Sequence, residues 1–598
     1  MTTQTLPTEE QIAAQQEADE KAIAKIKAKV EKRFAAMSTV IKRMDDDMGR
    51  WRMDPFIPSA QEGVALEDAY TSNRDRAVAE KVVRGIASSQ RVIRVENDAS
   101  TKKTQGGDFE DANDNVEYLA IGMLALADKR LEESGDQPVQ DQQAFFAPIR
   151  GKHVISRALL LKDMDGQTVV DILPIDPRNF VFERGGRIIL WACNRIMRSR
   201  SEIRDSYPNF KFKSEGDRAE EDDGDQQELV HDYYEYRAPT FTPVQQTADG
   251  PVGGEQETWP YWNGVIIDDQ WAKPLADTHA IKCPIIVRAV GSMPNLPQAQ
   301  NDPNNTDPGY SAHAGDSVFA LNRQVTRMIN RVTSYRVALT AAAVDRSYKV
   351  FSRGANLTFA DNPMKKGTPI PLDTEEKQDV EPIEVAQTGI DAQVLNSQLF
   401  VDWAAGGLSD QAISGTPPPG GLSAAALRLL GSNLGERTRP FLRPVESNLL
   451  GCLEALIAQY ETGSYLPLRV YGKTASNQAF DREITHASIA GHGNLSLKLL
   501  QDLPEDDQLK WATAKMATDK NPEGNALLSM QTGREKLIGI QDSGLEDERL
   551  RVEKAKALLP VLTLIDMMEA CAARGEMQYA VYLKFKIDAM IAMEMRPP

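Results

Sequence analysis

Hydrophobic positions along the chain follow two different spacings, which predicts a mixed α+β protein. Apolar residues three and four positions apart indicate helices over residues 9–46, 74–90 and 115–132. Short apolar runs indicate strands over residues 91–95, 153–161, 168–173, 180–182, 229–236, 259–267 and 281–290. The turn at residues 163–166 should join two of these strands as a hairpin, followed by residues 180–182 as an edge strand. A linker rich in Pro and Asn at residues 293–308 ends this first region.

A long helix is predicted after the linker, within residues 309–343. Its apolar residues alternate at spacings of three and four, which indicates one packing seam through Val318, Leu321, Val325, Met328, Val332, Tyr335 and Leu339. Arg323, Arg327 and Arg331 make a basic stripe on its other faces. A salt-bridged outer face is the favoured interpretation of this stripe, and a face turned to DNA or to a neighbouring subunit is the alternative.

Short β segments follow over residues 344–386, and a second helix is predicted over residues 387–405. The β segments are too short for a core of their own, so they need neighbours. Thr388 and Asp391 form a capping-box pattern at the start of the second helix. We expect its seam to run through Ile390, Val394, Ser397, Val401 and Ala404.

A loop is predicted over residues 406–422, because this stretch holds five glycines and three consecutive prolines. Ser423 then caps a long helix that reaches residue 463 and that Pro440 and Pro444 should kink. A further β segment is expected over residues 464–504, and helices over residues 505–598.

Charge and composition narrow the possible functions. The chain has 598 residues with 69 basic and 87 acidic side chains, a formal net charge of −18, so any contact with DNA should be local or weak. The run 214–228 holds eight acidic residues and should be an exposed loop. Four widely spaced cysteines fit reduced thiols, and neither a membrane span nor a secretory signal is expected.

Sites of catalysis, cofactor binding or metal binding are not indicated by any motif. Gly151 and Lys152 lack the rest of a phosphate-binding loop, and Asp163 and Asp165 lack the rest of a calcium loop. The six histidines have no metal-ligand spacing, and each is expected on the surface or in a loop. The prediction is therefore a protein without enzymatic activity, cofactor or metal.

The order of these elements resembles the portal proteins, or head-to-tail connector subunits, of tailed double-stranded DNA bacteriophages. Helix, small β module, helix, glycine-rich loop and long kinked helix resemble the stem, clip, stem, tunnel loop and backbone helix of that family. The run Leu422-Ser423-Ala424-Ala425-Ala426-Leu427 resembles the family's entry to the last helix. Looser similarities lie at residues 173–178, 198–207, 284–286 and 538–553, so the resemblance spans roughly residues 74–554.

The resemblance implies a portal fold with these regions. They are N-terminal helices and wing (1–308), first stem helix (309–343), clip (344–386), second stem helix (387–405), tunnel loop (406–422), long kinked helix (423–463), wing β segment (464–504) and helical crown (505–598). In the stem, the residues of interest are Arg323, Arg327 and Arg331, and in the clip they are Lys349, Arg353, Lys365 and Lys366. The tunnel-loop residues expected in the DNA channel are Asp410, Gln411, Ser414, Gly415, Thr416, Pro417, Pro418, Pro419, Gly420 and Gly421.

The resemblance also implies a function and partners. A homo-oligomeric ring, usually a dodecamer, would stand at the capsid portal vertex of the virion after synthesis in the host cytoplasm. Double-stranded DNA would pass through it during packaging and ejection. The terminase large subunit, major capsid and scaffolding proteins, and tail adaptor proteins would be its partners, with no membrane involved. The alternatives are another virion structural or head-tail adaptor protein, or a cytoplasmic enzyme with an unrecognised site.

Overall fold

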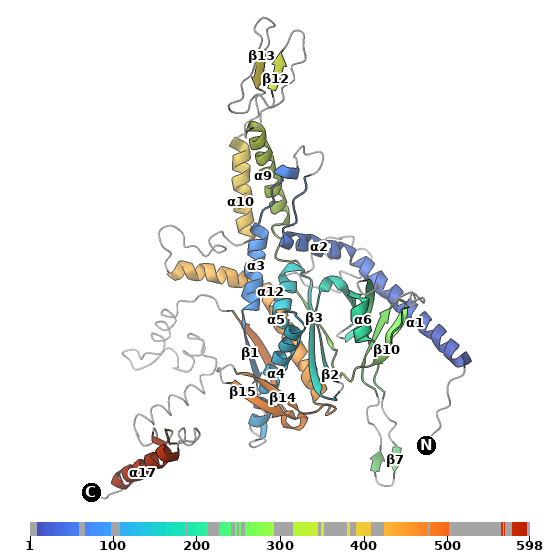
Figure 1. Cartoon of the computed structure of the whole chain (residues 1–598), viewed down its shortest axis with the longest axis vertical. Coiled ribbons are helices and arrows are strands. Elements are labelled where there is room, and N and C mark those ends of the chain that lie inside the picture. The colour runs from blue at the N-terminus through green and yellow to red at the C-terminus, as the bar shows by residue number, and fades with distance from the viewer. Residues whose placement is uncertain are drawn as a thin grey trace. The chain divides into compact units, whose positions relative to one another are not determined.

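A computed structural model describes the chain in segments (Figure 1). The described residues are 9–58, 66–96, 108–163, 165–186, 188–212, 226–240, 245–247, 250–252, 258–291, 315–344, 348–351, 379–382, 390–407, 424–474, 479–501, 564–565, 567–568 and 577–594. The chain divides into one compact unit of Met1–Gly472 with Ala479–Leu503, and a second of Lys473–Gln478 with Pro504–Pro598. In the second unit the helix α17 (Met577–Glu594) is described. Most of the predicted acidic loop, residues 214–225, and most of the region 505–598 lie outside the described residues. The end of that predicted loop is wrong, because Gln227 and Glu228 belong to the strand β6 (Gln227–Tyr236).

Helices and strands both build the first unit, so the predicted α+β class is confirmed. Its helices are α1 (Glu9–Ala36), α2 (Ser38–Arg52), α3 (Arg74–Ala87), α4 (Asp108–Glu133), α5 (Val139–Ile149), α6 (Arg200–Ser206), α9 (Arg323–Val344), α10 (Ile390–Gly406) and α12 (Ala424–Tyr460). Its strands are β1 (Gln90–Glu96), β2 (His153–Lys162), β3 (Thr168–Ile175), β4 (Phe180–Gly185), β5 (Ile188–Ser199), β6 (Gln227–Tyr236), β7 (Gln245–Thr247), β8 (Gly250–Val252), β9 (Tyr261–Ile267), β10 (Gln270–Asp277), β11 (Ile285–Ala289), β12 (Tyr348–Phe351), β13 (Asp379–Pro382), β14 (Leu468–Lys473), β15 (Ala479–Ile484) and β16 (Asn494–Leu500).

The strands form several small antiparallel sheets. The predicted hairpin is confirmed as β2 and β3, which β11 extends in the order β11-β2-β3. The predicted edge strand after the hairpin is confirmed as β4, and it is the edge of a separate five-stranded sheet ordered β10-β9-β6-β5-β4. Two-stranded sheets pair β1 with β16, β12 with β13, β14 with β15 and β7 with β8.

The predicted helix over residues 9–46 is two helices, because the chain turns at Met37 between α1 and α2. α1 lies against β4 and β10. Its buried Val30 and Phe34 pack with Trp191 and Tyr233 of the five-stranded sheet. These apolar side chains therefore dock the helix on a sheet.

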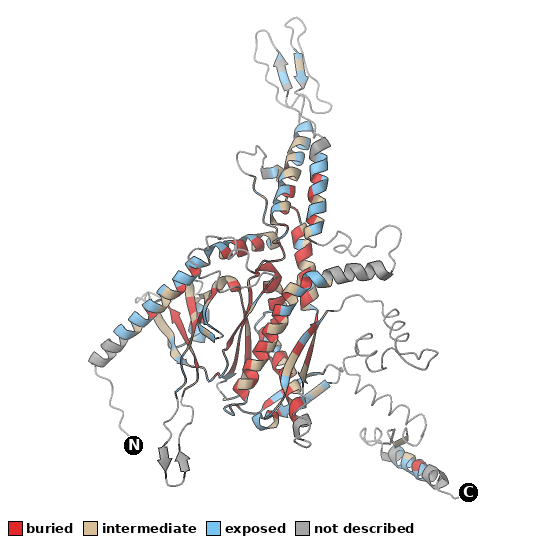
Figure 2. Cartoon of the chain, turned by 180° about the vertical axis from the view of Figure 1, so that it is seen from behind, coloured by how far each residue is buried: buried red, intermediate tan, exposed pale blue. Residues whose placement is uncertain are grey.

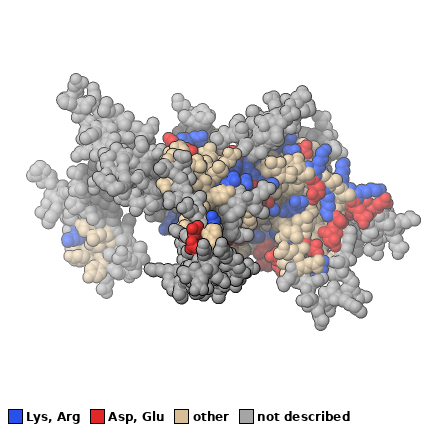
Figure 3. Space-filling view, turned by 90° about the horizontal axis from the view of Figure 1, so that it is seen from above, with Lys and Arg blue, Asp and Glu red and all other residues tan. Residues whose placement is uncertain are grey.

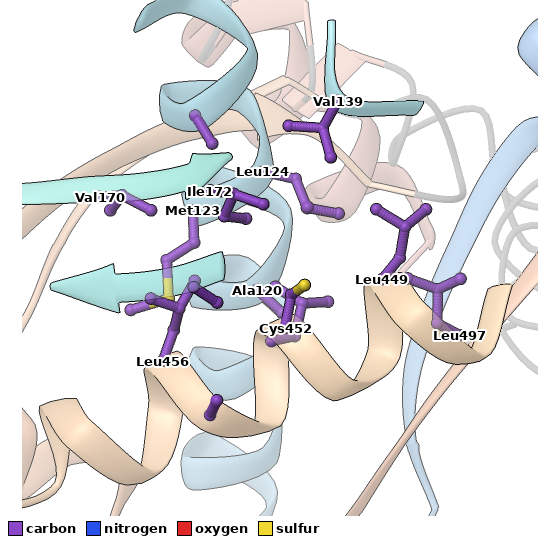
Figure 4. Packing of buried hydrophobic residues seen from close by; sticks show 14 of the residues in the cluster. Ala120, Met123, Leu124, Val139, Val170, Ile172, Leu449, Cys452, Leu456 and Leu497 are labelled. Carbon is purple, nitrogen blue, oxygen red and sulfur yellow. The ribbon is translucent and has the colours of Figure 1, made fainter. Parts of the chain in front are cut away.

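The main core surrounds α12, which packs against β2, β11, β16, α3, α4 and α5. Figure 4 shows Leu449, Cys452 and Leu456 of α12 facing Ala120 and Met123 of α4. Residues of this helix are buried over most of its second half (Figure 2). α12 changes direction along its length in Figure 1, in keeping with the two prolines inside it, Pro440 and Pro444.

Among the described residues, no helix is long and apolar enough to cross a membrane.

Candidate functional site

The helices α9 and α10, here called the helical arm, pack side by side through one apolar face (Figures 1 and 2). Buried Ile329 of α9 meets buried Leu399 and Trp403 of α10, and Val78 of α3 joins the same cluster. At the base of the arm, Asn322 Nδ2 donates a hydrogen bond to the Trp403 carbonyl oxygen at 3.1 Å. The arm is therefore a helical hairpin whose lower end is fixed on the rest of the first unit, here called the body.

The predicted packing seams are confirmed at Val318, Val325, Val332 and Ala404, which pack against this cluster, and wrong at four other positions, which are exposed. Leu321, just before α9, and Met328 within it are 64% and 42% exposed, and Val394 and Val401 of α10 are 61% and 62% exposed. The buried side chains from Asn322 onward include polar ones, namely Asn322, Thr326, Asn330 and Ser334. Each helix has apolar residues on two faces, and periodicity alone does not show which face is used within one chain.

A buried carboxylate, Asp47 of α2, holds the base of α9. Arg323 donates to it from Nε at 2.9 Å and from a terminal guanidinium nitrogen at 2.7 Å. Ser317 Oγ donates to the same carboxylate at 2.6 Å, and Asp47 is 0% exposed. Two parallel N–H donors fix the orientation of the pair as well as its distance. This ion pair therefore joins the N-terminal helices to the first residues of the arm.

A second buried carboxylate, Asp75 of α3, binds both helices of the arm. Its Oδ1 accepts hydrogen bonds from Thr326 Oγ1 at 2.7 Å and from Trp403 Nε1 at 3.0 Å. Its Oδ2 accepts from Arg50 at 3.0 Å, and Arg50 also donates to the Arg323 carbonyl oxygen at 3.1 Å. Asp47 and Asp75 together, here called the base carboxylates, fix α9 and α10 relative to α2 and α3.

The three stem arginines have different surroundings. Arg323 is paired inside the chain with Asp47, in agreement with the favoured salt-bridge interpretation. Arg327 and Arg331 are exposed, and the Arg331 guanidinium lies 5.8 Å from the Tyr335 ring centroid. The stripe therefore has one structural member and two members on the surface.

The β12–β13 pair, here called the β tip, is inserted in the chain between α9 and α10. It pairs Tyr348 with Pro382 and Phe351 with Asp379 in antiparallel register. Lys349 is exposed on β12, and Phe351 is 49% exposed. The other three clip residues, Arg353, Lys365 and Lys366, lie outside the described residues.

The predicted tunnel loop also lies outside the described residues, apart from its first two positions, but the helices on both sides of it are described. α10 ends at Gly406, and the Arg437 guanidinium of α12 donates to the carbonyl oxygens of Ala405 at 2.9 Å and Gly406 at 3.4 Å. A cation at the carbonyl end of a helix is favourable for the helix dipole. This contact joins the end of α10 to the long helix that follows the loop.

The Gly151–Lys152 pair has a structural place at the start of the arm rather than a phosphate-binding loop. Both residues have positive φ, and the Lys152 amide donates to the Gly315 carbonyl oxygen at 2.6 Å. Burial, with a smaller contribution from Arg43 and Arg33, lowers the pKa of Lys152 to about 8.

The turn at residues 163–166, between β2 and β3, is a β-turn as predicted, with the Gly166 amide donating to the Asp163 carbonyl oxygen at 2.8 Å.

Two histidines contradict the expectation of surface or loop positions. His153 lies buried in β2, and His231 lies buried in β6. Burial lowers the pKa of His231 to about 4, with smaller contributions from Lys27 and Arg195. Burial also holds the pKa of His153 well below its usual value, so both rings are neutral core residues near neutral pH.

A metal centre is not apparent in the part of the chain that the structure describes. No group of three or more His, Cys, Asp or Glu side chains there is placed to hold a metal ion. A cleft of about 710 Å³ opens between α2 and α9, but it is lined by side chains of both charges, including Lys42, Asp46 and Arg327. Figure 3 likewise shows basic and acidic side chains interspersed over the described surface seen from above.

The base carboxylates are the main feature that sequence reasoning missed. Asp47 lies directly after the predicted helix over residues 9–46, and its partner Arg323 is 276 residues away in the chain. Local patterns carry no signal for such a pair. The aromatic residue Trp403 in a predicted helix is a hint of a buried anchor that the sequence does offer.

Comparison with known proteins gives a structural similarity but no family. No family model matches the chain, and no curated protein matches it. A chain from the solved structure "Neck of native GTA particle computed with C12 symmetry" is similar at 13% identity with a TM-score of 0.31, covering 76% of this chain and 97% of that one. A TM-score this low carries no argument, so the function proposed below rests on the features of this chain.

Proposed function

We propose that this chain is the portal protein of a tailed double-stranded DNA bacteriophage, the subunit of a ring through which the genome is packaged and ejected. The observation that carries the proposal is the helical arm, interrupted by the β tip and held on the body by two buried carboxylates. A long helical hairpin with a fixed base suits a channel wall, which has to keep its position while DNA moves past.

Exposed apolar residues on the arm support an oligomer. Leu321 and Met328 on the α9 side and Val394 and Val401 on α10 are each more than 40% exposed in the single chain. Large apolar side chains exposed on both helices of the arm indicate contact with another protein. In a homo-oligomeric ring, with twelve subunits as the family resemblance implies, each subunit would cover part of the next.

The charge of the chain supports a passive conduit for DNA. A net charge of −18 repels the phosphate backbone over distances of the order of the Debye length, roughly 10 Å at 0.1 M salt. DNA would then slide past the wall instead of binding to it. The tunnel loop, Asp410 to Gly421, would touch the duplex sterically, and no residue would act in catalysis.

The β tip would be the docking site for other components. Lys349, with Arg353, Lys365 and Lys366, would meet acidic surfaces of the terminase large subunit during filling and of tail adaptor proteins afterwards. Charge reversal at Lys365 and Lys366 tests this assignment, which fails if both binding partners are retained. The body would face major capsid and scaffolding proteins at the capsid vertex.

Electron microscopy of the purified protein tests the proposal. We expect class averages of rings with an axial hole in top view. Compact small oligomers without a hole would contradict it and favour an enzyme. Deletion of Ser414–Gly420 adds a functional test: rings should persist while packaging or DNA retention fails. Normal genome-filled heads from this deletion variant would point to another virion structural or adaptor role.

A further inference from the structure

We propose that the helical arm pairs head to tail with the arm of a second copy of this chain, with the outer face of α9 against the outer face of α10. This inference rests on the proposed ring and names the residues that would join its subunits. The outer face is the side of each helix that is turned away from the other helix and from the body. The two outer faces differ in charge and match each other in their apolar residues.

Two sides of α9 are covered within the single chain. Ile329 marks the side that faces α10, where it packs with Leu399 and Trp403. A second side is covered by the segment before α3. There the Ser72 amide donates to Asn330 Oδ1 at 2.9 Å, and the Tyr70 amide donates to Ser334 Oγ at 2.8 Å. These contacts leave one side of the helix without a neighbour in the described residues.

The remaining side of α9 is its outer face. At about 100° per residue, Leu321, Met328 and Arg331 turn away from both covered sides. Leu321 and Met328 are exposed, as is Arg331 next to them, and exposed Arg327 lies at the edge of this face, where it also lines the cleft toward α2. Over its whole length α9 has four arginines and no acidic residue. This face therefore offers methyl and methylene groups between positive charges.

The outer face of α10 is apolar with acidic side chains. Val394 and Val401 lie on the side opposite to buried Trp403, and both are more than 60% exposed. Asp402 is exposed beside them and accepts a hydrogen bond from Gln398 at 3.0 Å. α10 has two aspartates and no lysine or arginine. Its outer face therefore complements that of α9 in charge.

The direction of the side chains favours the same pairing. Side chains of a helix lean toward its N-terminus, so those of α9 lean toward the base of the arm and those of antiparallel α10 lean toward its tip. The hydrogen bond between Asn322 and Trp403 shows that these two residues lie at the same height along the arm, near its base. Asp402 therefore lies near the base as well, and Arg327 lies about one helical turn closer to the tip than Asp402. Arg327 and Asp402 of neighbouring copies would therefore lean toward each other.

A second copy in head-to-tail contact fits these faces better than a two-fold dimer. A two-fold contact through α9 would bring the Arg327 and Arg331 side chains of both copies together, and like charges in contact are unfavourable. A head-to-tail contact joins two different faces and leaves one of each kind free at the ends. Repetition of this contact closes into a ring when the rotation between copies allows it.

Disulfide cross-linking of the full chain tests this pairing. We would introduce Met328→Cys and Val401→Cys together and oxidise the protein mildly. A ladder of cross-linked species on a non-reducing gel is expected from the double variant and from neither single variant. The pair Ile188→Cys with Val401→Cys is the matched control, since Ile188 is exposed on β5 in the five-stranded sheet. It should give no ladder.

Charge exchange gives a second measurement that does not depend on cysteines. Asp402→Arg should raise the protein concentration needed for ring assembly about two- to fivefold, and adding Arg327→Asp should reverse part of that change. If electron micrographs show rings, but the double cysteine variant gives no cross-linked ladder and the charge exchange does not change ring assembly, this pairing is wrong and the proposed function still stands. Absence of rings from the unmodified protein would overturn the proposed function itself.

Discussion

Replacing the buried carboxylate Asp47 by asparagine should loosen the base of the helical arm. The change keeps the size of the side chain but removes the negative charge opposite Arg323, whose side chain is only 18% exposed. Breaking one side of a buried ion pair costs about 3–5 kcal/mol. Asp316 lies 3.6 Å from the same guanidinium and would compensate in part, so we expect about 3 kcal/mol.

Hydrogen–deuterium exchange of the α9 amides measures this loss locally. A loss of about 3 kcal/mol corresponds to roughly 100-fold faster exchange where opening of the arm limits the rate. Asp481→Asn is the matched control, because Asp481 also pairs with an arginine at 2.7 Å but on the surface. That variant should leave exchange unchanged. Equal exchange of α9 in Asp47→Asn and in the control would refute the role given to the base carboxylates.

Three further predictions concern single residues. Because the pKa of His231 is depressed from 6.5 to about 4 in the fold, the unfolded chain takes up its proton first as the pH falls. The melting temperature should therefore fall as the pH is lowered from 6.5 to 4. His231→Gln should make this fall smaller, whereas His486→Gln, at an exposed position, should leave it unchanged. Gly315→Ala should destabilise the fold by about 1–3 kcal/mol, because Gly315 has a φ of +74° and an added Cβ would overlap Lys152 Cα. Gly135 also has a positive φ, but no atom lies within 4 Å of where its Cβ would be, so Gly135→Ala should lower the melting temperature less. Trp403→Phe removes the donor to Asp75 and should cost about 1–2 kcal/mol, seen as faster exchange in α10 but not in β2.

Much of the fold could be predicted because local patterns were strong. The run RVIRV and the β2–β3 hairpin were predicted close to their observed bounds. α5 was missed because the first half of its sequence is mostly polar and Pro148 stands in its last turn. β10 was missed because Pro274 interrupts it, which an edge strand tolerates since one side needs no ladder hydrogen bonds.

The candidate site was less predictable, because its parts meet only in the folded chain. Arg323 was assigned to an outer stripe by spacing alone, yet its partner comes from a helix far earlier in the sequence. His231 illustrates the same limit, since the predicted strand over residues 229–236 contains it but does not show that this position is buried. Burial of charged and polar groups depends on tertiary contacts that a local pattern does not contain.

The exposed positions of the predicted seams reflect which faces of α9 and α10 the single chain uses. The faces used within the chain are partly polar, with Asn322, Thr326 and Asn330 bonded to the body and to α10. Such bonds fix the direction of the arm, because each has a specific geometry. Apolar residues seven positions apart also lie on the outer faces, at Leu321 and Met328 and at Val394 and Val401. An apolar face that one chain leaves exposed is what a repeated contact between identical subunits would require.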